Sequence, residues 1–138
     1  MITPCNRLRT DKIISVSENK RTFKINNKSL LSINQVKVDG CFITSGNKCD
    51  FLFEIITNKV EKVFYVELKG RHIEDAIKQL EATLIHCKPY HGAITKESYI
   101  IASKVPKAST STQKLKKEFK RKNASQLFID TTLREVHL

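Results

Sequence analysis

Alternating apolar and polar positions predict a run of strands in the middle of the chain. From residue 36 to residue 69, apolar residues either alternate with polar ones or form short uninterrupted runs, which is typical of strands in a buried sheet. We assign strands to residues 36–44, 49–56 and 63–69. Polar turn residues separate them at 45–48 and 58–62. The pattern therefore predicts a three-strand antiparallel meander.

A helical period follows this meander. Four apolar residues recur at spacings of four, three and four, which lays one apolar stripe of a helix over residues 72–87 onto a sheet. Residues 88–92 break the pattern, and residues 98–102 form a strand buried on both faces. Because a helix connects this strand to the third strand, the two are expected to run parallel. A basic amphipathic helix over 111–122 and a strand over 126–129 follow. The stripe consists of Ile73, Ile77, Leu80 and Leu84.

The first quarter of the chain has a weaker pattern. Apolar pieces at 13–16 and 23–25 lie among Ser, Asn and Lys and predict short strands or an irregular arm, and residues 28–34 predict a helical turn. A chain of 138 residues can bury one core. We therefore expect a single domain, with an N-terminal arm over 1–35 and a core over 36–130.

Charged residues interrupt two of the predicted strands. Because successive side chains alternate along a strand, Glu67 and Lys69 point to one face together with Tyr65. A hairpin return of the preceding strand brings Asp50 to the same face. Two carboxylates can hold a hard divalent cation, while a lysine beside them orients or helps to deprotonate a water molecule.

This arrangement resembles the active site of the PD-(D/E)xK nuclease superfamily, the restriction-endonuclease-like fold that includes Holliday-junction resolvases and RecB-type nucleases. In that family an aspartate begins one strand and a Glu-x-Lys triplet lies on the next. The match puts Asp50 on the aspartate and Glu67-Leu68-Lys69 on the triplet. Cys49 stands where the family usually has proline.

The resemblance extends to the helix at residues 72–87. Ten residues after Lys69, Gln79 looks like the glutamine that RecB-type members carry beside the metal site. Those members continue Gln-x-x-x-Tyr, whereas this chain has Thr83 at the last position.

What the resemblance implies is an α/β protein with an αβββαβ core, in which helices flank a mixed central sheet. It implies a DNA endonuclease that hydrolyses phosphodiester bonds with Mg²⁺ or Mn²⁺. Asp50, Glu67 and the backbone carbonyl of Leu68 would hold the metal, Lys69 would position the attacking water, and Gln79 would orient the nucleophile or the ligand shell. Cutting both strands of a duplex with one site per chain favours a homodimer.

Other interpretations of these acids stay open. Asp39 is either a third metal ligand or part of an Asp-Gly turn, and Glu18 is the candidate for the carboxylate that many family members take from the leading helix. Glu67 and Lys69 could instead form a solvent-facing cross-strand pair, with Asp50 capping a turn. The apolar surroundings argue against this, because buried charges are costly unless they are paired or metal-bound.

The charge of the chain points to a polyanionic partner. The sequence has 25 basic and 14 acidic residues, a formal net charge of +11, and nucleic acid is the commonest counterpart of such an excess. Few aromatic residues lie outside core-like runs, so contacts to the DNA backbone are expected. The alternatives are a solvated helix face and, for the whole chain, a catalytically inactive nucleic-acid-binding or protein-interaction module on the same fold. The densest basic run contains Lys114, Lys116, Lys117, Lys120, Arg121 and Lys122; a looser set contains Lys12, Lys20, Arg21, Lys24 and Lys28; Arg71 and Lys78 lie nearer the predicted site.

Cysteine and histidine give little evidence of a metal site. No Cys-x-x-Cys spacing occurs, and Cys41 and Cys49 could face one another across the predicted hairpin. No apolar run approaches the length of a membrane span, and the N-terminus lacks a signal peptide, so we expect a cytoplasmic protein with reduced thiols and no membrane contact. The histidines are expected at the surface or at helix ends, with His72 closest to the site. They are His72, His86, His91 and His137.

Overall fold

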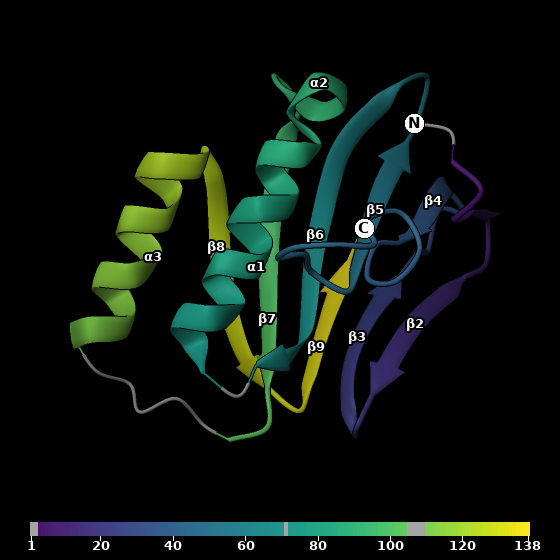
Figure 1. The fold of residues 1–138 in the computed structure, drawn as a ribbon. Coiled ribbons are helices and arrows are strands. Elements are labelled where there is room, and N and C mark those ends of the chain that lie inside the picture. The colour runs from purple at the N-terminus through teal and green to yellow at the C-terminus, as the bar shows by residue number, and fades with distance from the viewer. Residues whose placement is uncertain (1–2, 71, 105–109) are drawn as a thin grey trace.

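The described part of the chain forms two sheets and three helices (Figure 1). The structure is a computed structural model that describes residues 3–70, 72–104 and 110–138. The large sheet has the order β1-β4-β5-β6-β7-β8, with β1 (Asn6–Arg9), β4 (Ser32–Lys37), β5 (Phe51–Ile56), β6 (Val60–Gly70), β7 (Thr95–Ala102) and β8 (Ser125–Thr131). The small sheet has the order β2-β3-β9, with β2 (Ile13–Glu18), β3 (Arg21–Asn26) and β9 (Leu133–His137).

The large sheet is mixed. The pairs β1/β4, β4/β5 and β5/β6 are antiparallel, whereas β6/β7 and β7/β8 are parallel. The parallel pairs require crossover connections, which α1 (Ile73–His86), followed by the short α2 (Lys88–His91), and α3 (Thr110–Asn123) supply. Both long helices lie on one face of the large sheet, and the small sheet covers the other face (Figure 1). The domain therefore has three layers.

Alternation along the strands produces one apolar cluster on each face of the large sheet. On the helix side, Tyr65 of β6 packs with Leu80 of α1 and Phe119 of α3. On the other side, Phe64 of β6 packs with Phe23 of the small sheet. This division confirms the predicted facing of residues 63–66 and 68, because Val63 and Tyr65 belong to one cluster whereas Phe64, Val66 and Leu68 belong to the other.

Several predicted elements are confirmed. The structure is a mixed α/β fold, and β5, β6, β7, β8, α1 and α3 match the predicted elements to within a few residues at their ends. The parallel crossover between β6 and β7 is also as expected.

The N-terminal quarter is more regular than the prediction. Of the two alternatives for residues 13–16 and 23–25, short strands are confirmed as β2 and β3, whereas β1 was not predicted and β4 begins at Ser32 where a helical turn was expected. No helix precedes the strands in the described residues. The reason is a period of two: Ile14 and Val16 on β2, and Phe23 and Ile25 on β3, alternate with more exposed residues and cover the large sheet. These short apolar segments form strands because they can bury their apolar side chains against the large sheet.

The first strand of the predicted meander also differs. The strand expected over 36–44 ends at Lys37, and a connection over 38–50 replaces the hairpin turn expected at 45–48. Both Gly40 and Gly46 have a φ of +77°, a left-handed conformation that turns the chain and that glycine adopts without strain. The apolar residues of this segment predicted a strand. Two of them, Val38 and Ile43, are buried as expected, but they lie in a connection and not in a strand.

A disulfide joins Cys5, which precedes β1, to Cys41 in the 38–50 connection. The expectation of reduced thiols is therefore wrong for Cys5 and Cys41. Cys41 bonds to Cys5 and not to Cys49, because the 38–50 connection turns back toward β1 in place of the predicted hairpin. Cys49 and Cys87 are free and buried.

None of the helices in the described ranges combines the length and the apolar character needed to cross a membrane.

Candidate functional site

The β5/β6 hairpin brings Asp50 to the segment that carries Glu67. Asp50 directly precedes β5, and its backbone N–H donates to the carbonyl of Val66 at 3.0 Å. One oxygen of its carboxylate accepts the backbone N–H of Leu68 at 2.7 Å. Both acids are buried, with 4% of Asp50 and 1% of Glu67 exposed. Two carboxylates from separate segments therefore meet at one end of this strand pair.

Helix α1 fixes the segment that leads into Asp50. The side-chain oxygen of Thr83 accepts the backbone N–H of Cys49 at 2.8 Å and donates to the carbonyl of Gln79 at 3.0 Å. Gln79 is half-buried one turn before Thr83, and residues four apart lie on the same side of a helix. Thr83, at the position where the resemblance led us to expect tyrosine, thus holds the Asp50 segment in place, with Gln79 beside it on α1.

The ladder between β6 and β7 is irregular at the site. Glu67 pairs with Ile100, but the register shifts before Gly70 pairs with Ala102. The carbonyl of Leu68, predicted as a metal ligand, accepts a hydrogen bond from the guanidinium of Arg21 on β3 at 3.0 Å. This bond uses one of the two lone pairs of the carbonyl oxygen. A cation from the small sheet is therefore held against the backbone beside Glu67.

The two additional acids lie in different settings. The backbone N–H of Asp39 donates to the carbonyl of Asp50 at 3.3 Å, and Gly40 has the positive φ of an Asp-Gly turn. The turn interpretation is thus supported, and the same turn brings Asp39 next to Asp50 along the backbone. Glu18 ends β2 in the small sheet, on a strand and not on a leading helix.

Some predicted residues fall outside the description. The backbone of Lys69 belongs to β6, but its side chain and the whole of Arg71 lie outside the described residues. Within the described ranges, no group of three or more His, Cys, Asp or Glu side chains is arranged to hold a metal ion. The acidic side chains described at the site are Asp50 and Glu67, beside the carbonyl oxygen of Leu68.

A second buried polar group lies on the same strands and was missed by sequence reasoning. Glu54 on β5 accepts hydrogen bonds from Asn34 at 2.8 Å and pairs with His91 at 2.6 Å. The other ring nitrogen of His91 bonds to the hydroxyl of Tyr65. Of the two predicted settings for His91, a helix end is confirmed and the surface is wrong: His91 is the last residue of α2, and its ring is fully buried. We call Asn34, Glu54, Tyr65 and His91 the histidine network.

Burial and hydrogen bonding set the protonation of this region. Burial alone would raise the pKa of Glu54, but hydrogen bonds from His91 and Asn34 hold it below its ordinary value. Burial raises the pKa of Cys87 to about 12 and raises the pKa of Tyr65 further above its ordinary value. The thiol and the phenol therefore stay protonated at neutral pH. The histidine network is buried and hydrogen-bonded, so its role is to stabilise the fold.

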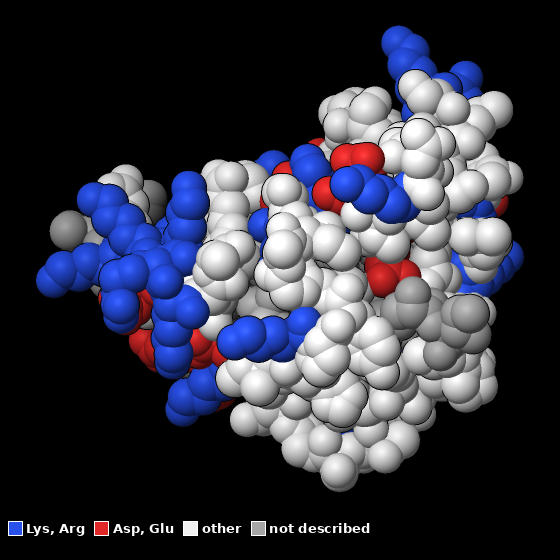
Figure 2. Space-filling view, turned by 90° about the horizontal axis from the view of Figure 1, so that it is seen from above, with Lys and Arg blue, Asp and Glu red and all other residues white. Residues whose placement is uncertain are grey.

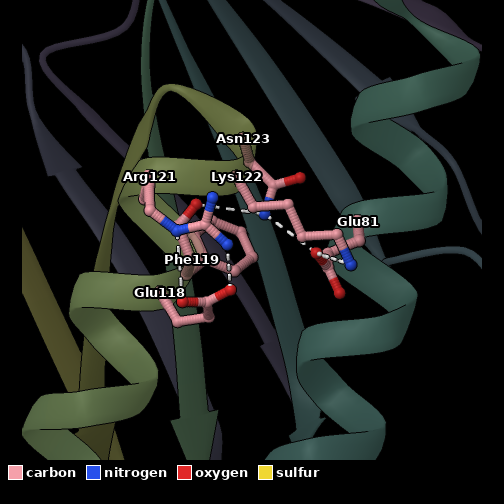
Figure 3. Close-up of polar contacts among 6 residues, drawn as sticks. All are labelled: Glu81, Glu118, Phe119, Arg121, Lys122 and Asn123. Carbon is pink, nitrogen blue, oxygen red and sulfur yellow. Dashed lines mark hydrogen bonds and ion pairs between the residues drawn. The ribbon is translucent and has the colours of Figure 1, made fainter.

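The predicted basic helix is α3, and its cations project into solvent. Phe119 anchors it to the sheet, and Figure 2 shows Lys and Arg side chains gathered over it at the left end of the molecule. Arg121 pairs with Glu118 on the same helix, and Lys122 pairs with Glu81 of α1 at 3.3 Å (Figure 3). The exposed or partly exposed cations of α3 are Lys114, Lys116, Lys117, Lys120, Arg121 and Lys122. Lys78, which is also exposed, lies on α1.

The site thus combines an acid before one strand, a Glu-x-Lys triplet on the next and a glutamine on the following helix. The structure brings Asp50, Glu67 and Leu68 together, puts Gln79 on the helix that covers them, and leaves the cations of α3 on a separate element. Sequence alternation was the signal that found the acids, whereas no sequence signal indicated Arg21 or His91. Comparisons of the chain with protein-family models, with curated proteins and with solved structures found no match.

Proposed function

We propose that the protein is a metal-dependent endonuclease that hydrolyses DNA phosphodiester bonds at Asp50 and Glu67. The observation that carries the proposal is the hydrogen bond from the Leu68 N–H to the Asp50 carboxylate, beside Glu67. Two carboxylates brought together in a buried position repel one another, and a divalent cation relieves that repulsion. The resemblance to PD-(D/E)xK nucleases supplies the reaction type.

The donor set fits Mg²⁺ or Mn²⁺. Carboxylate oxygens are hard ligands, and such ions are commonly held by one or two carboxylates together with water and substrate phosphates. Asp50 and Glu67 would hold the ion, which when bound polarises the scissile phosphate and lowers the pKa of a bound water. The Leu68 N–H holds Oδ2 of Asp50 and thereby orients this carboxylate.

The remaining roles belong to the chain's own groups. Lys69 positions the attacking water and steadies the developing negative charge, as the resemblance implies. Gln79 orients the nucleophile from α1. The cations of α3 hold the DNA backbone, because their exposed charges suit phosphate contacts that carry no sequence information.

One observation favours a second function, a nucleic-acid-binding module without catalysis. Arg21 occupies one lone pair of the Leu68 carbonyl, which the family resemblance assigns to the metal. A carbonyl oxygen that already accepts a hydrogen bond from a guanidinium is a poorer ligand for a divalent ion, because the cation beside it repels the ion. The two functions differ in whether a divalent ion binds and whether DNA is cut.

Cleavage assays with the full chain test the proposal. Supercoiled, linear, single-stranded and branched DNA are incubated with Mg²⁺, Mn²⁺ or Ca²⁺, and products are followed on gels. We expect cleavage with Mg²⁺ or Mn²⁺, and a loss of about 10³-fold or more in Asp50→Asn and in Glu67→Gln, with little further loss when they are combined because the groups act as a unit. Glu74→Gln, which removes an exposed acid from the first turn of α1, is the matched control.

Metal binding is measured in the same variants by titration calorimetry with Mn²⁺. Binding by the wild type and by Glu74→Gln, but by neither site variant, is the expected result. DNA cleavage that persists in either site variant overturns the assignment. DNA binding without metal binding or cleavage identifies the second function.

A further inference from the structure

A lysine-lined hollow lies at the other end of the helix layer. About 220 Å³ in volume, it opens between α1, α2, β7 and the end of α3, and Lys88, Lys96 and Lys122 line it. It shares Lys96 with an adjoining hollow that Lys120 also lines. We call this surface the lysine hollow and define it by Lys88, Lys96, Lys120 and Lys122. They come from two stretches of the sequence, 88–96 and 120–122, which the fold brings together.

Lys96 is a fixed ammonium at the centre of the lysine hollow. Its Nζ donates to the carbonyls of Gly92 at 2.8 Å and Ile94 at 2.9 Å. An ammonium has three N–H donors, so these bonds orient the group and leave one donor for a ligand. Burial lowers the pKa of Lys96, because a partly desolvated ammonium is less stable without an anion beside it. The group is therefore preorganised for an anionic ligand.

Acidic residues near the lysine hollow already have cationic or hydroxyl partners. Glu97 accepts hydrogen bonds from Lys62 at 3.2 Å and from the hydroxyl of Tyr99 at 2.9 Å. Glu81 pairs with Lys122 and also accepts the side-chain amide of Asn123 (Figure 3). Pairing with these groups offsets the two negative charges, so Lys88, Lys96 and Lys120 leave an excess of positive charge.

The lysine hollow is distinct from the acidic site. Lys96 pairs with Val63 in the β6/β7 ladder, and Val63 precedes Glu67 by four residues, which corresponds to about 13 Å along a strand. Helix α3 connects the two ends of the sheet, since its 14 residues span about 21 Å and it runs alongside β8 (Figure 1). Its exposed cations continue the positive charge of the lysine hollow toward the end of the sheet that carries the acids.

We propose that the lysine hollow binds the phosphodiester backbone of a nucleic acid and that α3 continues this contact toward Asp50 and Glu67. The inference rests on the proposed function for the nature of the polymer. Lysine ammonium groups from three elements suit phosphates because they act as point charges without a fixed planar geometry. A net charge of +11 and a row of cations longer than any small anion favour a polymer over a free phosphate.

Salt-dependent binding tests this inference separately from cleavage. A Glu67→Gln background removes turnover, and fluorescence anisotropy of labelled duplex and single-stranded DNA is measured over a KCl series. Lys88→Ala/Lys120→Ala, which leaves buried groups intact, is expected to weaken duplex binding at least about tenfold at 0.1 M salt and to lower the log-log salt slope by about 1.8. Lys96→Gln, which retains a donor near the two carbonyls, should weaken binding in the same direction.

The matched control is Lys12→Ala/Lys28→Ala, which removes the same charge from exposed lysines near the small sheet. Its salt slope should stay within about 0.5 of the parent, which is less than one phosphate contact. Equal slopes for the hollow variant and its parent, or a larger loss in the control, overturn the inference. Binding of inorganic phosphate or ATP without duplex binding also overturns it. A chain that binds DNA through the lysine hollow but never cuts DNA refutes only the proposed nuclease activity.

Discussion

Two buried carboxylate groups lie on the same strands and differ in their partners. Glu54 and Val63 are register partners in the β5/β6 pair, whereas Asp50 and Glu67 lie about 13 Å away at the other end. Glu54 is surrounded by His91 and Asn34, which donate hydrogen bonds to it. Asp50 accepts the backbone N–H of Leu68, and the same segment of β6 contributes a second acid, Glu67.

The difference teaches how to tell a structural acid from a functional one. A single carboxylate supplied with donors is stable as it is, because hydrogen bonds replace the water it loses on burial. Two carboxylates in one buried place raise the energy of the fold unless a cation joins them. The histidine network therefore serves stability, and the acidic pair is the better candidate for chemistry.

The largest expected contrast is in the free energy of unfolding. His91→Ala leaves the Glu54 carboxylate buried without its imidazole partner and should destabilise the protein by about 3–5 kcal/mol. Glu67→Gln, measured without divalent ions, should change stability by less than about 1 kcal/mol or increase it, because it removes repulsion with Asp50. Urea denaturation followed by circular dichroism measures both.

Addition of Mg²⁺ sharpens the same comparison. An ion that binds the native state raises its stability, so Mg²⁺ should stabilise the wild type and His91→Ala but not Glu67→Gln. A loss in Glu67→Gln as large as that in His91→Ala would mean that both acids are structural.

Loss of the disulfide is expected to have an intermediate effect on stability. This bond restrains the connection that leads to Asp50. Cys5 and Cys41 are 36 residues apart in sequence, and Cys41 lies in the connection that ends at Asp50. Removing a link that closes a loop of this length should cost about 2–4 kcal/mol. Thermal unfolding of Cys5→Ser/Cys41→Ser is compared with that of the wild type, with and without reductant.

The double serine variant should also cut DNA more slowly, because its 38–50 connection is less restrained next to Asp50. His91→Ala is the control for general destabilisation. Equal melting temperatures for oxidised and reduced wild type would contradict the stabilising role of this bond.

The smallest expected effect is a pH dependence that belongs to Glu54. Its pKa is lower in the folded protein than its ordinary value of 4.5, so the unfolded chain takes up the proton first as the pH falls. The stability that Glu54 contributes is therefore complete above about pH 4.5 and is lost as the pH falls through the folded pKa. Urea titrations between pH 3 and pH 7 compare the wild type with Glu54→Gln.

The difference between the two stability curves should be constant above this window and should shrink below it. A difference that grows as the solution becomes more acidic would show that the carboxylate is not stabilised by His91 and Asn34. The same titration of Glu67→Gln separates the contribution of the acidic pair from that of the histidine network.

The sequence by itself determined the elements that carry the acidic site. A period of two assigned Tyr65 and Glu67 to one face of β6, and a period near 3.6 placed Leu80 and Leu84 on the buried side of α1. These inferences succeeded because the facing of a residue depends on the geometry of its own strand or helix. The same local reasoning put Asp50 in a strand over 49–56, whereas β5 begins one residue after it, at Phe51.

Only the tertiary structure decided which distant groups meet. His91 reaches Glu54 across 37 residues, and Arg21 reaches Leu68 across 47. The strands before residue 32 form because the large sheet offers them an apolar face, and the lysine hollow exists because α3 returns beside α2 and β7. A sequence pattern reports how each residue faces within its own element, whereas contacts between elements depend on the packing of the whole chain.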